Sequence, residues 1–150
     1  MNNKKEVPVD IRPVTRDDAE DVCRICCDDL GYQCDKYLVG ERISQLDTNR
    51  EAVFVAVTDG KVVGYIHVEK YNTLYFETMA NILGLAVSGK CRKKGVGKAL
   101  LEQAEKWASD NEITLMRLNT GTSRSGAHEF YKHMGYTSEK NQLRFVKRID

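Results

Sequence analysis

The chain has 150 residues, of which 41% are hydrophobic and 30% charged, as is typical of a single globular domain spanning residues 1–150. Its formal net charge is only +1, so no global field favours nucleic acid or an anionic membrane as a partner. No hydrophobic run is long enough to cross a bilayer, and the first ten residues lack the apolar core of a signal peptide, which favours a cytoplasmic protein.

The first third of the chain predicts one strand and two helices. Val9–Val14 is a short β-branched segment, and Thr15–Asp18 resembles a capping box in which Asp replaces the usual Glu or Gln. A helix should run from there to about Leu30 and end at Gly31. A second helix with weaker periodicity is expected over residues 35–46.

Of the five cysteines, Cys23 and Cys26 in the first predicted helix are expected to be packing residues, and a redox role for Cys91 stays open. An odd count without a secretory signal argues against a disulfide framework, and the Cys23-x-x-Cys26 spacing lacks a second pair of ligands for a metal. One helical stripe collects several small or apolar side chains: Ala19, Val22, Cys23, Cys26 and Leu30. We therefore expect buried thiols and no metal site.

The middle of the chain predicts three strands. Ala52–Thr58 and Lys61–Lys70 are rich in β-branched residues, and Asp59-Gly60 between them is a strong two-residue hairpin signal. A polar and aromatic connection, residues 71–78, leads to a third strand at Asn81–Val87.

The last third of the chain supplies a β-α-β unit. A helix from Val96 to about Asp110 follows the Asn81–Val87 strand, and Ile113–Thr120 is the next strand, so the crossover should be right-handed. A short helix at Ser125–Met134 precedes closing strands at residues 136–137 and 142–149. The predicted fold is a mixed α/β (α+β) domain, with a mostly antiparallel central sheet, flanking helices and one parallel β-α-β unit.

The loop that opens the helix at Val96 has the composition of an anion site. No acidic residue occurs over residues 78–101, and the part of this stretch from residue 90 to 98 contains two glycines and five basic residues, namely Lys90, Arg92, Lys93, Lys94, Gly95, Gly97 and Lys98. Free N–H groups and the helix dipole make a helix N-terminus attractive to phosphate. The loop is therefore interpreted as a pyrophosphate-binding site, although a solvated basic turn would have similar charges.

Two familiar phosphate motifs do not fit this loop. A Walker loop needs Ser or Thr after Gly97-Lys98, where this chain has Ala99. A dinucleotide fingerprint needs a third glycine where Leu100 stands.

The residues Arg92–Gly97 instead form R-x-x-G-x-G, which resembles the acyl-CoA pyrophosphate loop of the GNAT superfamily of N-acetyltransferases. The resemblance extends to Leu85-Ala86-Val87 before the loop and to residues 98–101 after it. Residues 127–136 are similar to the A-x-x-F-Y-x-x-x-G-F segment of the family, and residues 11–15 to its opening. The resemblance therefore covers nearly the whole chain.

This resemblance implies acetyl-CoA as the acyl-donor cosubstrate and no metal. The backbone of Leu85, Ala86 and Val87 would bind the pantetheine arm. The pyrophosphate would contact the loop and helix start, namely Arg92, Lys93, Lys94, Gly95, Val96, Gly97 and Lys98. Asn119 is expected to hydrogen-bond the cosubstrate, and Arg124 either contacts a phosphate or faces water.

The implied reaction is direct attack of a primary amine on the thioester. Tyr131 matches the general-acid tyrosine of the family, although its spacing from Ala127 also suits core packing. Glu77 is the candidate base, acting directly or through water, and an exposed loop acid is an equally good interpretation. The alternative function is a non-catalytic acyl-CoA-binding or regulatory module on the same fold.

The acceptor cleft of the family is walled by the first two helices, here around residues 30–36. Residues 10–51 hold eleven acids against six bases, which would suit a cationic amine such as an aminosugar, a polyamine or a peptide amine. Solvated helix faces explain the same charges. Homodimerisation through the C-terminal strands is a further expectation by family analogy alone.

Overall fold

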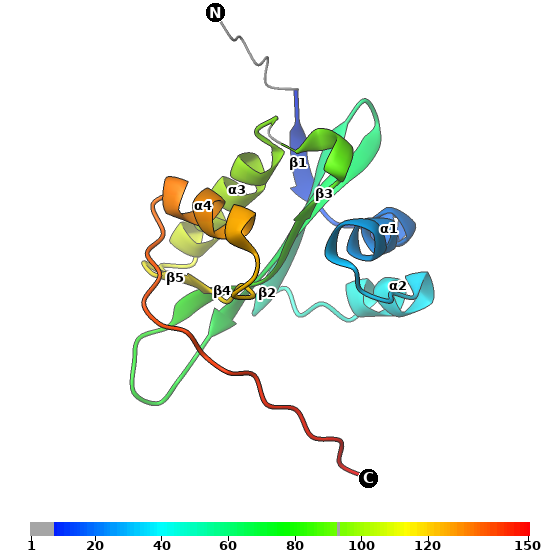
Figure 1. The fold of residues 1–150 in the computed structure, drawn as a ribbon. Helices are drawn as coiled ribbons and strands as arrows, with labels where there is room; N and C mark the ends of the chain where they lie inside the picture. The colour runs from blue at the N-terminus through cyan, green and yellow to red at the C-terminus, as the bar shows by residue number, and fades with distance from the viewer. Residues whose placement is uncertain (1–7, 93) are drawn as a thin grey trace, which may run out of the picture. The chain divides into compact units, whose positions relative to one another are not determined.

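A five-stranded sheet is the centre of the fold in the computed structural model, which describes residues 8–92 and 94–150 (Figure 1). The strands lie side by side in chain order, as β1 (Asp10–Pro13), β2 (Glu51–Thr58), β3 (Lys61–Tyr71), β4 (Met79–Val87) and β5 (Met116–Leu118). All neighbours are antiparallel except β4 and β5, which are parallel. The predicted mixed, mostly antiparallel sheet with one parallel β-α-β unit is confirmed.

The chain divides into two compact units, Met1–Leu118 and Asn119–Asp150. The first unit holds the sheet, and the second holds α4 (Ser125–His133) and the C-terminal segment. The single-domain organisation expected from the chain length stays a prediction. Within the described ranges, no helix has both the length and the hydrophobicity that a bilayer span requires.

Helices cover both faces of the sheet in the first unit. On one face lie α1 (Ala19–Leu30), which follows the short 3-10 helix η1 (Arg16–Asp18), and α2 (Lys36–Ser44) (Figure 1). The opposite face carries α3 (Val96–Asp110). The core between α1 and the sheet is made of buried side chains, namely Val22, Ile25, Cys26, Val55, Val62 and Ala86.

The approach of α3 to the sheet depends on Gly64 in β3. A Cβ atom at this position would lie 3.0 Å from the Ala86 carbonyl oxygen and 3.1 Å from Leu100 Cδ1. The helix presents a stripe of buried apolar side chains to the sheet: Val96, Leu100, Leu101, Ala104 and Ala108. Glycine at position 64 thus lets the first turns of α3 pack directly on the backbone of β3 and β4.

A hairpin turn and a helix end lie where the sequence predicts them. Asp59 and Gly60 join β2 to β3 with φ values of 51° and 74°, the doubly positive pair that a tight type I′ hairpin requires. Gly31 ends α1 in the left-handed region at φ 72°. The predicted helix end and hairpin turn are therefore confirmed.

The predicted closing strands at residues 136–137 and 142–149 are wrong, because the structure has no strand after α4. A strand needs a hydrogen-bonded neighbour, and the described unit Asn119–Asp150 contains no other strand. The alternating apolar side chains stay between 76% and 90% exposed, namely Leu143, Phe145, Val146 and Ile149. The homodimer expected through these strands stays a prediction.

A partly buried ion pair joins β1 to the start of the helical layer. Arg12 Nη1 and Nη2 donate to Asp18 Oδ2 and Oδ1 at 2.7 and 2.9 Å, and the Thr15 backbone N–H donates to Asp18 Oδ2 at 2.8 Å. The Asp18 side chain is 7% exposed. The hydrogen bond from Arg12 is the main reason that the pKa of Asp18 is lowered. The predicted capping box is thus present and carries a bidentate pair.

Replacing this carboxylate should destabilise the fold at neutral pH. We expect Asp18→Asn to lower the free energy of unfolding by about 2 kcal/mol at pH 7, measured by urea denaturation. Because the folded pKa of Asp18 is lowered, its contribution is complete above the unfolded value of about 3.9 and is lost as the pH falls through the folded value. The difference between wild type and variant should therefore shrink in acid. Asp17→Asn at the exposed neighbour is the control, and an equal loss in both variants would contradict this account.

Candidate functional site

The turn between β4 and α3 has a backbone that glycine makes possible. The 3-10 helix η2 (Gly89–Cys91) follows β4, and the Ser88 N–H donates to the Val63 carbonyl at 2.7 Å, which holds the turn against β3. Gly95 is the N-cap of α3, with φ 84° in the left-handed region. A side chain at this position would strain the backbone, so the entry into α3 depends on Gly95.

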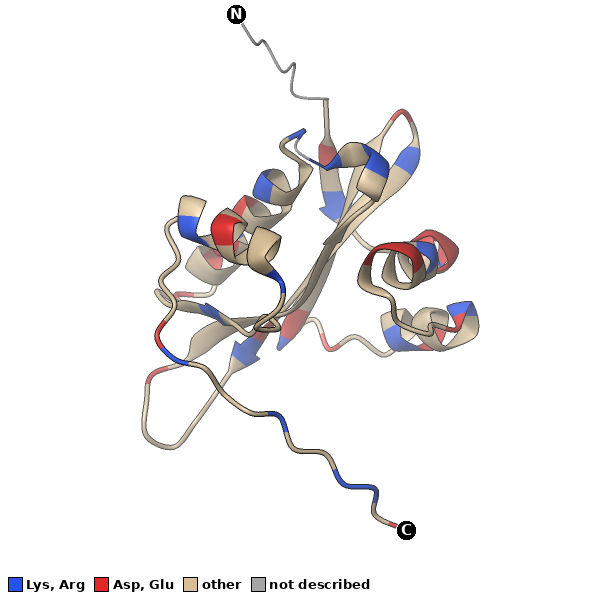
Figure 2. Cartoon of the chain, viewed as in Figure 1, with Lys and Arg blue, Asp and Glu red and all other residues tan. Residues whose placement is uncertain are grey.

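The N-terminus of α3 provides donors and positive charge without a competing group. The N-cap residue has no side chain to accept a hydrogen bond, and the first turn contains no acid. The backbone N–H groups of Val96, Gly97 and Lys98 therefore lack the usual capping partner. Exposed basic residues flank these donors (Figure 2), namely Lys90, Arg92, Lys94 and Lys98. Lys93, also a predicted ligand, lies outside the described residues. This end of the helix can hold an anion.

Arg92 has a carboxylate partner on the helical layer. Its Nη2 lies 3.4 Å from Oδ1 of Asp29 near the end of α1, and the two side chains are 59% and 13% exposed. A long, half-exposed pair of this kind contributes less than about 1 kcal/mol to stability. A guanidinium carries five N–H donors, so this contact leaves Arg92 able to bind a second anion.

The sheet opens between β4 and β5. The parallel ladder joins only Ala80–Ile82 to Met116–Leu118, whereas β4 pairs with β3 as far as Val87. Along residues 83–87 the other edge of β4 therefore has no strand partner among the described residues. Backbone N–H and C=O groups on such an edge need another partner, and an extended ligand can supply one. The predicted pantetheine-binding residues Leu85, Ala86 and Val87 lie on this open edge.

Glu77 lies just before the N-terminal end of β4, whereas the open edge is at the C-terminal end of this strand. Glu77 is exposed in the β3–β4 connection, two residues before β4 begins at Met79. A strand rises about 3.3 Å per residue, so Met79 and Leu85 are about 20 Å apart along β4. The role of Glu77 as the base stays a prediction.

Three other predicted site residues belong to the second unit. Asn119 is exposed, and Arg124 is the N-cap of α4. Tyr131 lies on α4 with its ring centroid 5.1 Å from that of Phe130 and 5.8 Å from that of Tyr136. Burial raises the pKa of Tyr131, and the nearby charge of Arg124 opposes this shift. The phenol therefore keeps its proton at neutral pH, as a general acid must, but the roles of these residues stay predictions.

A cavity of about 210 Å³ lies between α1, α2 and the sheet, and we call it the α1–α2 cavity. Most of its lining is aliphatic, for example Val22 on α1, Val39 on α2 and Val53 on β2. Three polar side chains face this lining, namely Arg42, Tyr65 and His67. The family resemblance predicted an acceptor cleft near α1 and α2, but it did not indicate these three residues.

The floor of the α1–α2 cavity is formed by alternate residues of β3. Tyr65 Oη lies 3.3 Å from Cys26 Sγ, and burial is the main reason that the pKa of Tyr65 is raised. His67 Nε2 lies 2.8 Å from Oε1 of Glu51 on β2. The sequence feature that could have indicated Tyr65 and His67 is the alternation of these two polar residues in a strand that is otherwise mostly apolar.

The cavity floor is adjacent to the open edge of β4. In the β3–β4 ladder, His67 pairs with Gly84 and Tyr65 pairs with Ala86. A Cβ atom on Gly84 would lie 3.0 Å from Tyr65 Oη, so the tyrosine ring rests on the backbone of β4. Reactants on the open edge and in the cavity would therefore be separated by the width of one strand.

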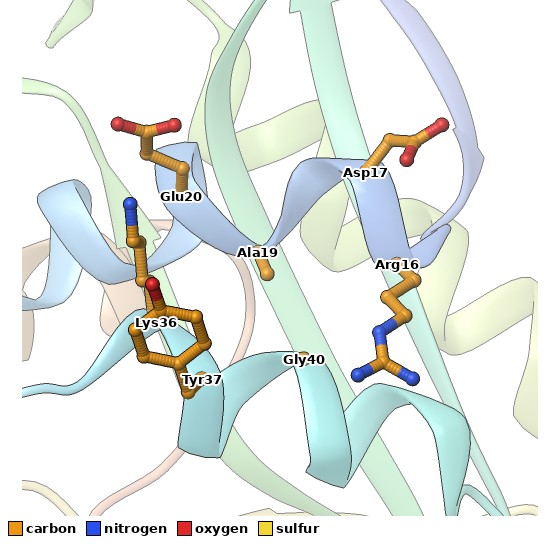
Figure 3. A pocket seen from close by; sticks show the side chains of 7 residues that line it. All are labelled: Arg16, Asp17, Ala19, Glu20, Lys36, Tyr37 and Gly40. Carbon is orange, nitrogen blue, oxygen red and sulfur yellow. The ribbon is translucent and has the colours of Figure 1, made fainter.

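A second, polar hollow of about 230 Å³ lies between the η1–α1 segment and α2 (Figure 3). Its charged groups are exposed, and its two cations, Arg16 and Lys36, contact neighbouring side chains. Arg16 bonds Glu41 at 2.9 Å and Ser44 at 3.1 Å, and Lys36 Nζ lies 5.5 Å from the centre of the Tyr37 ring. No residue of the sheet lines this hollow, so it has no connection with the open edge of β4.

The cysteines of α1 pack around the connection to α2. Cys26 is buried, and Cys23 Sγ donates to the Cys34 carbonyl at 3.1 Å. Burial is the main reason that the pKa of Cys34 is raised, to about 12. Within residues 8–92 and 94–150, no three His, Cys, Asp or Glu side chains are grouped so that they could hold a metal ion. The packing interpretation is consistent with this arrangement.

The family model described as "Acetyltransferase (GNAT) family" matches residues 19–136, which is most of the chain. The chain belongs to this family. The open edge of β4 and the uncapped start of α3 both fall within the matched range.

Individual relatives agree with this assignment. The chain is 28% identical over 150 residues to an uncharacterized N-acetyltransferase of Methanocaldococcus jannaschii, covering 93% of this chain and 66% of that protein. It is 32% identical over 96 residues to a streptothricin acetyltransferase of Escherichia coli, covering 63% and 53%. The chain thus spans between about half and two thirds of the length of these relatives. The structure of an aminoglycoside N-acetyltransferase in complex with CoA has the same fold, with a TM-score of 0.81, 20% identity, and 95% and 96% of the two chains covered.

The raised pKa of Cys34 should make this thiol slow to alkylate in the folded protein. Alkylation requires the thiolate, which is scarce at pH 8 when the thiol pKa is about 12. We expect mass spectrometry after iodoacetamide treatment to show at least tenfold slower labelling of Cys34 in the native chain than in the urea-unfolded chain. Equal rates in the two states would contradict a half-buried thiol that keeps its proton.

Proposed function

We propose that the chain is an acyl-CoA-dependent N-acetyltransferase that moves the acetyl group of acetyl-CoA to a primary amine. One observation carries the proposal: the edge of β4 that lacks a strand partner leads directly into the uncapped, acid-free N-terminus of α3. A thioester with a long amide-bearing arm and a diphosphate matches both features, since the arm needs backbone partners and the diphosphate needs N–H donors.

Docking of the donor follows from this arrangement. The diphosphate would bind the backbone N–H groups at the start of α3, with Arg92, Lys94 and Lys98 adding positive charge. Lys93, Gly95, Val96 and Gly97 complete the proposed loop. The pantetheine arm would hydrogen-bond the free edge at Leu85, Ala86 and Val87, and one N–H there would polarise the thioester carbonyl. Asn119 and Arg124 are proposed as further contacts.

The nucleophile must be a neutral amine. A lysine-like amine has a pKa of about 10.4, so its neutral form at pH 7 costs roughly 4–5 kcal/mol, which a base or a dry cleft helps to supply. The amine lone pair attacks the carbonyl carbon, the C–N bond forms and the C–S bond breaks, the electron pair leaves with sulfur, and the nitrogen loses one proton to a base or to water. The thiolate then takes one proton, for which Tyr131 is the proposed donor.

The acceptor is proposed to be a small-molecule amine. The two named relatives with known acceptors act on streptothricin and on aminoglycosides, which carry amino groups. The cytoplasmic location inferred from the sequence and the absence of a metal in the reaction are also part of this proposal. A binding or regulatory module on the same fold would take up acetyl-CoA without turnover.

Turnover should be detectable as free CoA thiol released from acetyl-CoA in the presence of amines. We expect Tyr131→Phe to reduce kcat about 100-fold, because the thiolate loses its proton donor, with less than a threefold change in the Kd for acetyl-CoA. Glu77→Gln tested alongside decides whether that carboxylate is a base. Acetyl-CoA binding with no thiol release for any amine would instead identify a binding module.

Docking of the diphosphate should depend on the backbone at Gly95. We expect Gly95→Ala to raise the Kd for CoA at least tenfold by calorimetry, because alanine disfavours the left-handed φ that aims the first N–H groups of α3. Gly60→Ala carries a similar backbone strain at φ 74° in the β2–β3 hairpin and serves as the control. If both variants bound CoA like the wild type, the α3 N-terminus would not be the diphosphate site.

A further inference from the structure

We infer that the α1–α2 cavity is the acceptor site and that it selects a small apolar amino acid, with its carboxylate on Arg42 and its amine facing His67. This inference rests on the proposed acetyl transfer and names its acceptor class. Three properties of the cavity support it: its size and apolar walls, the sign of its charge, and the histidine beside the open edge of β4.

The size and lining of the cavity favour a small acceptor with an apolar body. About 210 Å³ is below the roughly 300–1,000 Å³ of pockets that hold drug-sized ligands, so a polycyclic aminoglycoside would not fit inside. Leu38 lines the cavity and is itself 53% exposed, so it presents an apolar surface at the mouth of the cavity. Burying an aliphatic side chain against these walls would contribute about 1.5–3 kcal/mol to binding.

The charge of the cavity is positive. Arg42 on α2 lines it, and no described residue forms an ion pair with its guanidinium. Among the described residues, no acidic side chain lines the cavity. Five of the eleven carboxylates in residues 10–51 pair with Arg or His: Asp18 with Arg12, Asp21 with Arg24, Asp29 with Arg92, Glu41 with Arg16, and Glu51 with His67. None of the eleven is among the described residues that line the cavity, whereas a carboxylate ligand would give Arg42 an ion-pair partner.

His67 is placed to accept the proton that the amine loses. With Nε2–H donating to the Glu51 carboxylate, the lone pair of Nδ1 is the acceptor of the neutral ring. Both side chains are largely shielded from water, at 27% and 21% exposure. Glu51 is a positioning residue, since it fixes the ring without touching the acceptor.

The acetyl transfer can be written with every proton accounted for by the amine, His67, the CoA thiolate and solvent. The ammonium first passes one proton to His67 Nδ1, from which it reaches solvent, and the neutral amine attacks the thioester carbonyl carbon. As the C–N bond forms and the C–S bond breaks, the second N–H proton is released to water. The CoA thiolate takes up one proton, so the transfer releases one net proton to solvent.

The first test compares acceptors with the same apolar body. L-leucine and 3-methylbutylamine differ by the carboxylate alone, and L-lysine and kanamycin represent cationic acceptors. We expect kcat/KM from thiol release, checked by mass spectrometry of the product, to be at least tenfold higher for L-leucine than for each of the other three. Faster turnover of kanamycin, of L-lysine or of the amine without a carboxylate would overturn the inference.

The second test removes the charge of Arg42. Arg42→Gln should reduce the leucine-to-methylbutylamine ratio of kcat/KM at least fivefold toward one, while Arg42→Lys should retain part of the ratio. Lys36→Gln is the matched control, because Lys36 is a cation of the same helix that lines the other hollow. An unchanged ratio in Arg42→Gln, or an equal change in the control, would exclude Arg42 as the carboxylate partner.

The third test separates proton removal from folding. His67→Gln should lower kcat for L-leucine about 100-fold, but less than tenfold for aminooxyacetate, whose amino group is already neutral at pH 7. Gln can still donate to Glu51, and an unchanged melting temperature would confirm that the variant folds. An equal loss with both acceptors would exclude His67 as the base.

Failure of this inference can be distinguished from failure of the proposed function. If acetyl-CoA binds and other amines are acetylated, but leucine is not favoured, the acceptor assignment is wrong and the transferase stands. If calorimetry shows no acetyl-CoA uptake at millimolar concentration, both proposals are wrong.

Discussion

The structure depends on the unequal pairing of β4. Along one edge the strand is hydrogen-bonded to β3 as far as Val87, and along the other it is bonded to β5 only at Ala80–Ile82. Backbone groups cannot be left without partners inside a protein at low cost, so an edge of this kind needs water or a ligand as its partner. The same strand continues into the glycine turn and α3, which supplies further unpaired N–H groups. The two halves of the proposed donor site, the open edge of β4 and the N-terminus of α3, thus follow one another in the chain.

In the first unit, one face of the sheet carries α3 and the other face carries the α1–α2 cavity. On one face, Gly64 allows α3 to pack close to β3 and β4, which fixes the N-terminus of the helix relative to the open edge. On the other face, α1 and α2 enclose the α1–α2 cavity, and its floor residues His67 and Tyr65 pair with Gly84 and Ala86 of β4. The Arg12–Asp18 pair holds β1 to the start of the helical layer and so supports the wall of the cavity. A donor on the open edge and an acceptor in the cavity can meet across β4.

Features that depend on local chemistry could be predicted from the sequence. The Asp59-Gly60 hairpin, the end of α1 at Gly31 and the start of α3 at Gly95 each follow from backbone conformations that glycine permits. The fold class followed from the order of the elements, because β-α-β crossovers and hairpins restrict topology. The prediction that the loop at residues 92–97 binds acyl-CoA needed the additional resemblance of residues 85–87 and 127–136 to a known family.

Features that depend on distant contacts could not be predicted in the same way. The apolar alternation of residues 142–149 suggested a strand, but a strand forms only where a neighbour is available, and sequence alone does not show the neighbour. The acids of residues 10–51 suggested a cationic acceptor, which stays a prediction, and the sequence did not show that five of these acids pair with Arg or His. The α1–α2 cavity is lined by side chains of four elements and the segments that join them, so Arg42, Tyr65 and His67 could not be grouped beforehand.

The central claim is that the open edge of β4 and the N-terminus of α3 bind one CoA molecule together. The most direct measurement is the change of backbone amide chemical shifts in NMR spectra as CoA is added to the isotope-labelled chain. The account predicts that the largest changes occur at residues 85–87 and 95–98, and that both sets saturate at the same CoA concentration. Unchanged spectra at millimolar CoA, or changes confined to residues outside both segments, would contradict it.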